Sequence, residues 1–186
     1  MNYEKLEKQL KKKMDDDRYT HTLGVAYTSA CLAMRYGYSH EKAYLAGLLH
    51  DCAKCIDNNK KLELCEKNHI EVNDVEKENP FLLHAKLGSF LAKAKYEIDD
   101  EEILSAIRWH TTGHPGMTML EKIVFVADYI EPNRKKQPNL DEVRTLCFQD
   151  LDKGVKKILS DTLDYLHSKK DPIDEMTQQT YDYYNQ

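Results

Sequence analysis

The sequence contains little glycine and proline, no excess of basic residues and no long apolar run. Seven of its 186 residues are glycine and five are proline, so residues that break helices are few. No stretch approaches the roughly eighteen consecutive apolar residues that a membrane-spanning helix requires. Residues 1–17 contain no apolar core of the kind that a secretory signal needs. We therefore expect a cytoplasmic protein with no membrane partner.

The charge balance and the cysteine content exclude two further classes of protein. The chain has 27 basic and 32 acidic side chains, a formal net charge of −5, whereas general nucleic-acid binders carry a basic excess. We therefore expect no nucleic-acid partner. The five cysteines form an odd and irregularly spaced set, which does not indicate a disulfide framework. A chain of this length can fold without disulfides. The length also predicts one domain over residues 1–186.

The apolar residues recur at spacings of three and four, which is typical of helices. No stretch alternates as a strand does, and all five prolines fall between the helical segments. The acidic run at 15–17 is suited to cap a helix that starts near residue 18, and Ser39 is suited to cap the next. The sequence therefore predicts an all-α bundle of about 8–10 helices. The expected segments are 2–13, 18–36, 40–55, 59–68, 82–95, 99–110, 117–131, 139–150, 151–169 and 174–184.

Six polar side chains share helix faces with apolar neighbours, although burial of an unpaired charge is costly. They are His21, His50, Asp51, His84, His110 and Asp128. A single inward histidine is more often a hydrogen-bonded core residue than a ligand, and a single aspartate can be a cap or an ion-pair partner. Six such groups from five predicted helices are harder to explain separately. Together they indicate a metal or catalytic site, because a divalent cation satisfies imidazoles and carboxylates alike.

The order of His21, then the His50-Asp51 pair, then Asp128 resembles the HD superfamily of metal-dependent phosphohydrolases. Four longer strings narrow the resemblance to the bacterial YqeK-type symmetrical bis(5′-nucleosyl)-tetraphosphatases. The strings are RYTHTLGVAYTSACLA, LAGLLHDCAK, RWHTTGHPGM and IVFVADYIEPNR, and they span residues 18–134. A bare His-Asp pair is a weak signal, but four extended strings in this order are specific.

The resemblance implies an all-helical HD-domain bundle that hydrolyses diadenosine tetraphosphate symmetrically to two molecules of ADP. It also implies a divalent metal, commonly iron, and it suggests a homodimer. The metal ligands that it implies are His21, His50, Asp51 and Asp128. His84 and His110 match further histidines of the family that hold a second metal or contact the phosphate, so one or two ions are expected. Manganese, cobalt, nickel and zinc also suit mixed imidazole and carboxylate ligands.

Polyphosphate hydrolysis needs an activated water and groups that stabilise the charge developing on the phosphoryl oxygens. Together with the resemblance, this chemistry makes Asp51, Lys54, His84 and His110 the candidate catalytic residues. The candidate residues for the nucleotide and its phosphates are Arg18, His84, His110, Thr111, Asp128 and Arg134. Lys54 follows Asp51 by three residues, which matches the HD-x-x-K pattern of the family, and this resemblance implies that it contacts a bridging phosphate or the attacking water. The alternative for Lys54 is an ordinary exposed lysine, and the alternative for Arg18 and Arg134 is a pair of surface ion pairs without a role in phosphate binding.

Three other functions remain open from the sequence. The chain could be an HD phosphohydrolase of another nucleotide, such as a deoxynucleoside triphosphate, a mononucleotide or a cyclic nucleotide. It could also be a nucleotide-sensing HD module without turnover, or an all-α scaffold that binds a partner. The complete set of polar groups argues against the last two, because a sensor does not need every ligand and a scaffold needs none.

Overall fold

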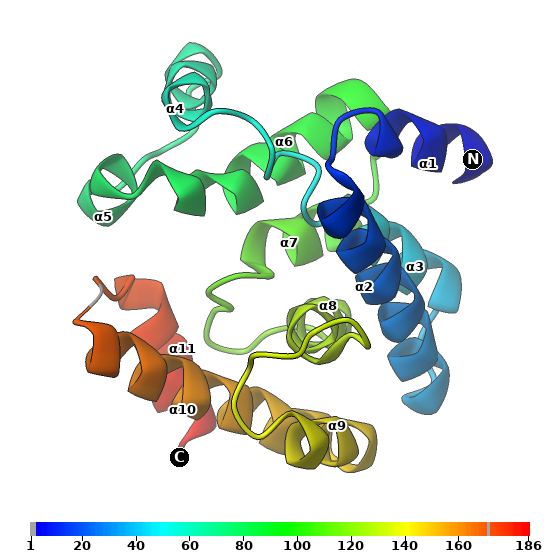
Figure 1. Cartoon of the computed structure of the whole chain (residues 1–186), viewed down its shortest axis with the longest axis vertical. Coiled ribbons are helices and arrows are strands. Elements are labelled where there is room, and N and C mark those ends of the chain that lie inside the picture. The colour runs from blue at the N-terminus through cyan, green and yellow to red at the C-terminus, as the bar shows by residue number, and fades with distance from the viewer. Residues whose placement is uncertain (1–2, 171) are drawn as a thin grey trace.

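The computed structural model describes residues 3–170 and 172–186, which form eleven α-helices and one short 3-10 helix (Figure 1). In chain order these are α1 (Tyr3–Lys11), α2 (Asp16–Arg35), α3 (His40–Leu49), α4 (Asn58–Lys67), α5 (Asp74–Glu78), η1 (Pro80–Leu83), α6 (His84–Tyr96), α7 (Glu101–Trp109), α8 (Met119–Ile130), α9 (Leu140–Gln149), α10 (Leu151–Lys169) and α11 (Glu175–Tyr184). The described residues contain no strand, which confirms the all-α prediction. None of these helices is both long enough and apolar enough to span a membrane.

Helix α8 lies at the centre of the molecule and organises its packing. It contacts α2 and α3 on one side, α7 on another, and α10 of the C-terminal group α9–α11 on a third (Figure 1). Its sequence is apolar on nearly every side, and Leu120, Ile123 and Val124 are fully buried. Helices α4, η1 and α6 enclose a second, smaller cluster around Leu83 and Leu87. The two apolar clusters hold α2, α6, α7 and α8 in place, so that parts of these four helices approach one another.

Capping side chains set the starts of the two helices that the sequence predicted to be capped. The Asp15 carboxylate accepts from the backbone N–H of Arg18 at 2.7 Å, and the Ser39 hydroxyl accepts from that of Lys42 at 3.2 Å. These bonds satisfy N–H groups that have no partner within the helix. Both predicted caps are confirmed.

The helix predicted over 40–55 is too long, because α3 ends at Leu49. Beyond it the chain continues in tight turns, with the N–H of Cys52 bonded to Leu49 O at 3.0 Å and that of Lys54 bonded to Asp51 O at 2.9 Å. The physical reason is the His50 side chain, whose Nδ1 lies 2.6 Å from Gly47 O. That carbonyl would accept the N–H of residue 51 if the helix continued.

The predicted helix over 99–110 likewise ends at Trp109, one residue before His110, and His84 is the first residue of α6. Three of the five predicted helices therefore present their polar side chains from their ends rather than from their interiors. The prediction also missed α5, which is five mostly charged residues without apolar periodicity, started by a capping box of Asn73 and Glu76. The first residue of the predicted helix 2–13 lies outside the described residues.

Helices α2 and α3 pack tightly against each other at Gly47. A Cβ there would lie 2.9 Å from both Ala26 Cα and Ser29 Oγ. We expect Gly47→Ala to force the helices apart and to lower the free energy of unfolding by about 1–3 kcal/mol, measured by urea denaturation. Gly88→Ala is the matched control, because its Cβ would meet its nearest neighbours at 3.4 Å and alanine favours a helix. Equal stability of the two variants would contradict this account of the contact.

Candidate metal centre

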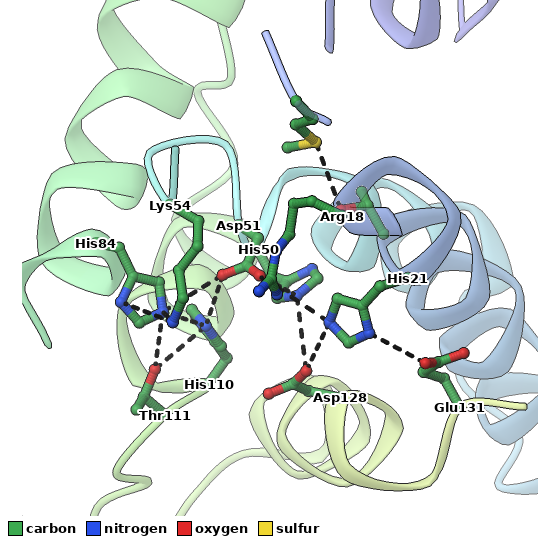
Figure 2. Close-up of polar contacts among 12 residues, drawn as sticks. Arg18, His21, His50, Asp51, Lys54, His84, His110, Thr111, Asp128 and Glu131 are labelled. Atoms are coloured by element: carbon green, nitrogen blue, oxygen red, sulfur yellow. Dashed lines mark hydrogen bonds and ion pairs between the residues drawn. The ribbon is translucent and has the colours of Figure 1, made fainter. Parts of the chain in front are cut away.

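The six polar side chains singled out in the sequence meet in one place (Figure 2). They come from α2, the end of α3, the start of α6, the end of α7 and α8, and are His21, His50, Asp51, His84, His110 and Asp128. All are buried except Asp128, whose side chain is 24% exposed. Segments far apart in the chain thus bring two carboxylates and four imidazoles together.

Asp51 lies between two pairs of histidines. Its Oδ2 faces the Nε2 atoms of His21 at 3.9 Å and His50 at 3.5 Å. Its Oδ1 faces the Nε2 atoms of His84 at 3.3 Å and His110 at 3.7 Å. These contacts define a first triad of His21, His50 and Asp51 and a second triad of Asp51, His84 and His110. Within each triad the potential ligand atoms all lie within 4.8 Å of one another. One buried carboxylate is therefore shared by two groups, each of which could hold a metal ion.

Asp128 stands beside the first triad. Its Oδ1 lies 2.9 Å from His21 Nε2 and 3.8 Å from His50 Nε2, and it accepts a hydrogen bond from Arg134 Nη2 at 2.7 Å. This position is the one expected of a fourth ligand to an ion held by His21, His50 and Asp51.

Three of the four imidazoles are oriented by backbone carbonyls. In each, Nδ1 lies within hydrogen-bond distance of the carbonyl oxygen three residues earlier. The pairs are His50 with Gly47 at 2.6 Å, His84 with Phe81 at 2.7 Å and His110 with Ile107 at 2.7 Å. Because a carbonyl oxygen only accepts, these Nδ1 atoms carry the hydrogen and the Nε2 atoms present a lone pair to Asp51. This is the tautomer that binds a cation through Nε2.

The fourth imidazole has a different partner, which the sequence reasoning missed. His21 Nδ1 lies 3.1 Å from Oε1 of Glu131, a carboxylate that is only 1% exposed. Glu131 follows Asp128 by three residues inside the string IVFVADYIEPNR, but this spacing alone does not indicate a contact with His21 on another helix.

The donor atoms fit a divalent cation. The Nε2 atoms of His21 and His50 are buried and have no hydrogen-bond partner among the described residues, although a carboxylate oxygen of Asp128 lies 2.9 Å from the first of them. An imidazole lone pair and a carboxylate oxygen repel each other at this distance unless a proton or a metal cation lies between them. Buried imidazole and carboxylate together suit a first-row transition metal.

The protonation states of the site also favour a cation. Burial raises the pKa of the Asp51 carboxyl, but His50 and His110 lower it more, so this pKa lies well below its usual value. Burial raises the pKa of the Asp128 carboxyl, but the neighbouring His21 ring and the charge of Arg134 lower it more, so this pKa is also well below its usual value. Burial, with Lys54 and His110, lowers the pKa of His84 well below its usual value. The carboxylates are therefore charged and His84 is neutral near pH 7.

Four residues predicted to contact phosphate or water surround the two triads. Arg18 donates to Asp51 Oδ2 at 2.7 Å, as Arg134 does to Asp128. Lys54 is half-buried, with Nζ 3.2 Å from Nε2 of His84. The Thr111 hydroxyl lies 3.3 Å from the same Nε2 and 3.2 Å from that of His110. Lys54 is thus not an ordinary exposed lysine, and the arginine ion pairs belong to the centre rather than to the surface.

Two cavities approach the site, and neither is lined by Asp51, His84 or His110. One of about 400 Å³ is lined by Arg18, His21, Arg134 and Lys135, among other residues. Another of about 250 Å³ is lined by Lys86, Arg108, Trp109, Thr111 and Thr112, among others. Figure 2 shows Thr111, which lines the second of these cavities, and Glu131, which lines the first, on opposite sides of Asp51.

The fold and the site define an HD-domain protein. The family model described as "HD domain" matches residues 18–133, so the chain belongs to this family. It is also similar to two curated proteins named "Bis(5'-nucleosyl)-tetraphosphatase, symmetrical". The one from Bacillus subtilis is 38% identical, with 98% of this chain and 97% of that protein covered. The one from Halalkalibacterium halodurans is 40% identical, with 97% and 96% covered. The resemblance seen in the sequence is confirmed.

A solved structure supports the same family assignment. The crystal structure of an HD superfamily hydrolase from Clostridium acetobutylicum, described as involved in NAD metabolism, matches with a TM-score of 0.96 at 38% sequence identity. The match covers 100% of this chain and 97% of that one. The helices outside residues 18–133 therefore also have counterparts in a relative.

Because both triads share Asp51, we expect its loss to weaken metal binding more than the loss of a residue that only orients a metal ligand. Asp51→Ala should weaken metal retention by more than the roughly 10- to 100-fold that is typical when a residue that orients a metal ligand is lost. The measurement is metal analysis of anaerobically purified protein, followed by competition with a chelator. Asp161→Ala is the control, because Asp161 is a buried carboxylate that binds Lys157 and Asn139 instead. Equal metal content in the Asp51 and Asp161 variants would rule out Asp51 as a ligand.

Proposed function

We propose that this protein is a metal-dependent hydrolase that cleaves diadenosine tetraphosphate and related dinucleoside polyphosphates symmetrically. Diadenosine tetraphosphate and one water would yield two molecules of ADP. The observation that carries the proposal is the Asp51 carboxylate shared by two buried histidine triads, in a chain that matches symmetrical tetraphosphatases over nearly its whole length.

The proposed ligands are His21, His50, Asp51 and Asp128, with His84 and His110 either on a second ion or on the phosphate. A bound divalent cation would lower the pKa of a water and polarise a phosphoryl oxygen. The two oxygens of Asp51 face different triads, so this carboxylate would contribute to holding both ions if two are bound. The water's oxygen would then bond to one of the two central phosphorus atoms, and the bond from that atom to the bridging oxygen would break.

The chain's own cations would bind and orient the polyphosphate. Guanidinium groups match phosphate oxygens in geometry, and Arg18 and Arg134 line the cavity beside the first triad. Lys54 Nζ lies beside the second triad, where it would stabilise the charge developing on the phosphoryl oxygens. Thr111 would contact phosphate from the other cavity. Each cavity would receive one nucleoside diphosphate half, with the central bond of a symmetrical substrate near the shared carboxylate.

Four finer points of the proposal rest on the sequence and its family resemblance. The native metal is iron, the enzyme is cytoplasmic, residues 1–186 form one domain and two chains form a homodimer. Metal analysis of the anaerobically purified protein tests the first of these. Sedimentation of the same sample tests the last.

The decisive assay is product analysis with purified protein and diadenosine tetraphosphate across added Fe²⁺, Mn²⁺, Co²⁺, Ni²⁺ and Zn²⁺. We expect ADP as the only nucleotide product. Formation of ATP with AMP would overturn symmetrical cleavage. Turnover of a deoxynucleoside triphosphate or a cyclic nucleotide, with none of diadenosine tetraphosphate, would replace the proposed substrate.

Lys54 should act on turnover rather than on metal binding. Burial lowers the pKa of Lys54, although the charges of Asp51 and Asp128 raise it. Methionine at this position would retain most of the bulk of the side chain without the charge. Lys54→Met should lower kcat by about 100-fold, the scale seen when one transition-state donor is removed, and leave the metal content unchanged. Lys61→Met is the control, because Lys61 is also buried but binds Asn58. Unchanged turnover in Lys54→Met would remove Lys54 from the mechanism.

A further inference from the structure

The Nδ1 atom of His21 faces a side-chain carboxylate, whereas those of the other three histidines face backbone carbonyls, and this difference points to a further residue of the metal centre. We propose that Glu131 is a positioning residue of the metal centre, holding the Nδ1–H of His21 so that Nε2 presents its lone pair to the cation. The proposal rests on the proposed metal centre. It concerns how that centre is built rather than what it hydrolyses.

His21 needs such a partner because of its place in a helix. His50, His84 and His110 stand at helix ends, where backbone carbonyls and N–H groups lack helical partners, and each uses the carbonyl three residues earlier. His21 stands inside α2, which spans Asp16–Arg35, so the preceding carbonyls accept bonds of the helix itself. A side chain from another element must therefore fix its ring, and the structure supplies Glu131 from the end of α8.

The Glu131 carboxylate is held at both oxygens. Oε1 lies 3.1 Å from His21 Nδ1, while Oε2 accepts from the backbone N–H of Asn133 at 2.7 Å and from its Nδ2 at 3.1 Å. Three N–H donors thus converge on one buried carboxylate. Both of its oxygens must accept, so this arrangement assigns the hydrogen on His21 to Nδ1 and leaves Nε2 able to bind a cation.

Gly24 makes room for this carboxylate. It lies one helical turn from His21 on α2, and a Cβ at this position would collide with Glu131 Oε2 and come within 3.3 Å of Asn133 Nδ2. Any larger residue at position 24 would push the carboxylate away from His21. Gly24 and Glu131 therefore form one device, contributed by two helices.

Two variants disrupt this device in different ways. In Glu131→Gln the single amide oxygen cannot accept on both sides. The two donors of Asn133 would take it and turn the amide NH₂ toward His21 Nδ1, which forces the hydrogen of the ring onto Nε2. Gly24→Ala would displace the carboxylate without any change of charge. Glu121→Gln is the matched control, because Glu121 is 2% exposed and pairs with a histidine, His114, at 3.0 Å outside the triads.

The full-length protein would be titrated with Mn²⁺, with free Mn²⁺ measured by electron paramagnetic resonance. We expect Glu131→Gln and Gly24→Ala to weaken Mn²⁺ binding by about 10- to 100-fold, and Glu121→Gln to leave it within about twofold of the wild type. Nitrogen-15 NMR of the metal-free protein should show the His21 hydrogen on Nδ1 in the wild type and on Nε2 in Glu131→Gln. A merely structural role would lower the melting temperature without moving either readout.

The possible failures are distinguishable. A wild type that binds no Mn²⁺ would contradict the metal centre itself. A wild type that binds Mn²⁺, with Glu131→Gln unchanged in affinity and in tautomer, would overturn the role of Glu131. If Gly24→Ala does not fold, Glu131→Gln decides alone, because it retains the shape of the native side chain.

Discussion

A buried carboxylate charge is the constraint on which the rest of this structure depends. Asp51 is 3% exposed, and its two oxygens face different pairs of imidazoles. A charge in such a place is tolerated only when other charges or metal ions compensate it. Helices α2, α3, α6, α7 and α8 converge on this carboxylate, and the packing of α8 against α2, α3 and α7 holds them in place.

Helix ends solve the problem of aiming several imidazoles at one carboxylate. A helix end offers backbone groups without helical partners, and a histidine placed there can lock its own ring against a nearby carbonyl. His50 and His110 do so just after α3 and α7, and His84 does so at the start of α6. Rings locked in this way lose little conformational entropy when a ligand arrives, so the site is preorganised. His21 lies inside a helix and depends on a carboxylate from a neighbouring one.

The sequence predicted the composition of this site better than its geometry. Helical spacing placed six polar residues on apolar faces, and all six converge, because a residue shielded by apolar neighbours points to the interior in any packing. The same reasoning extended the helix of His50 through Lys54, since spacing cannot register that a side chain competes for the carbonyl of Gly47. Glu131 was missed because its importance comes from its contact with another helix. Residue patterns along one element do not contain such contacts.

The local charges explain how an acidic protein can attract a polyphosphate. The carboxylates of Asp51, Asp128 and Glu131 are matched at the centre by the cationic groups of Arg18, Lys54 and Arg134. These three negative and three positive charges balance, so without a metal the set offers little attraction to a tetraphosphate. Each divalent cation would add two positive charges in a partly dehydrated site, where charge acts more strongly than in water. Affinity for the substrate would then follow metal occupancy, whereas the net charge of −5 is spread over the rest of the surface.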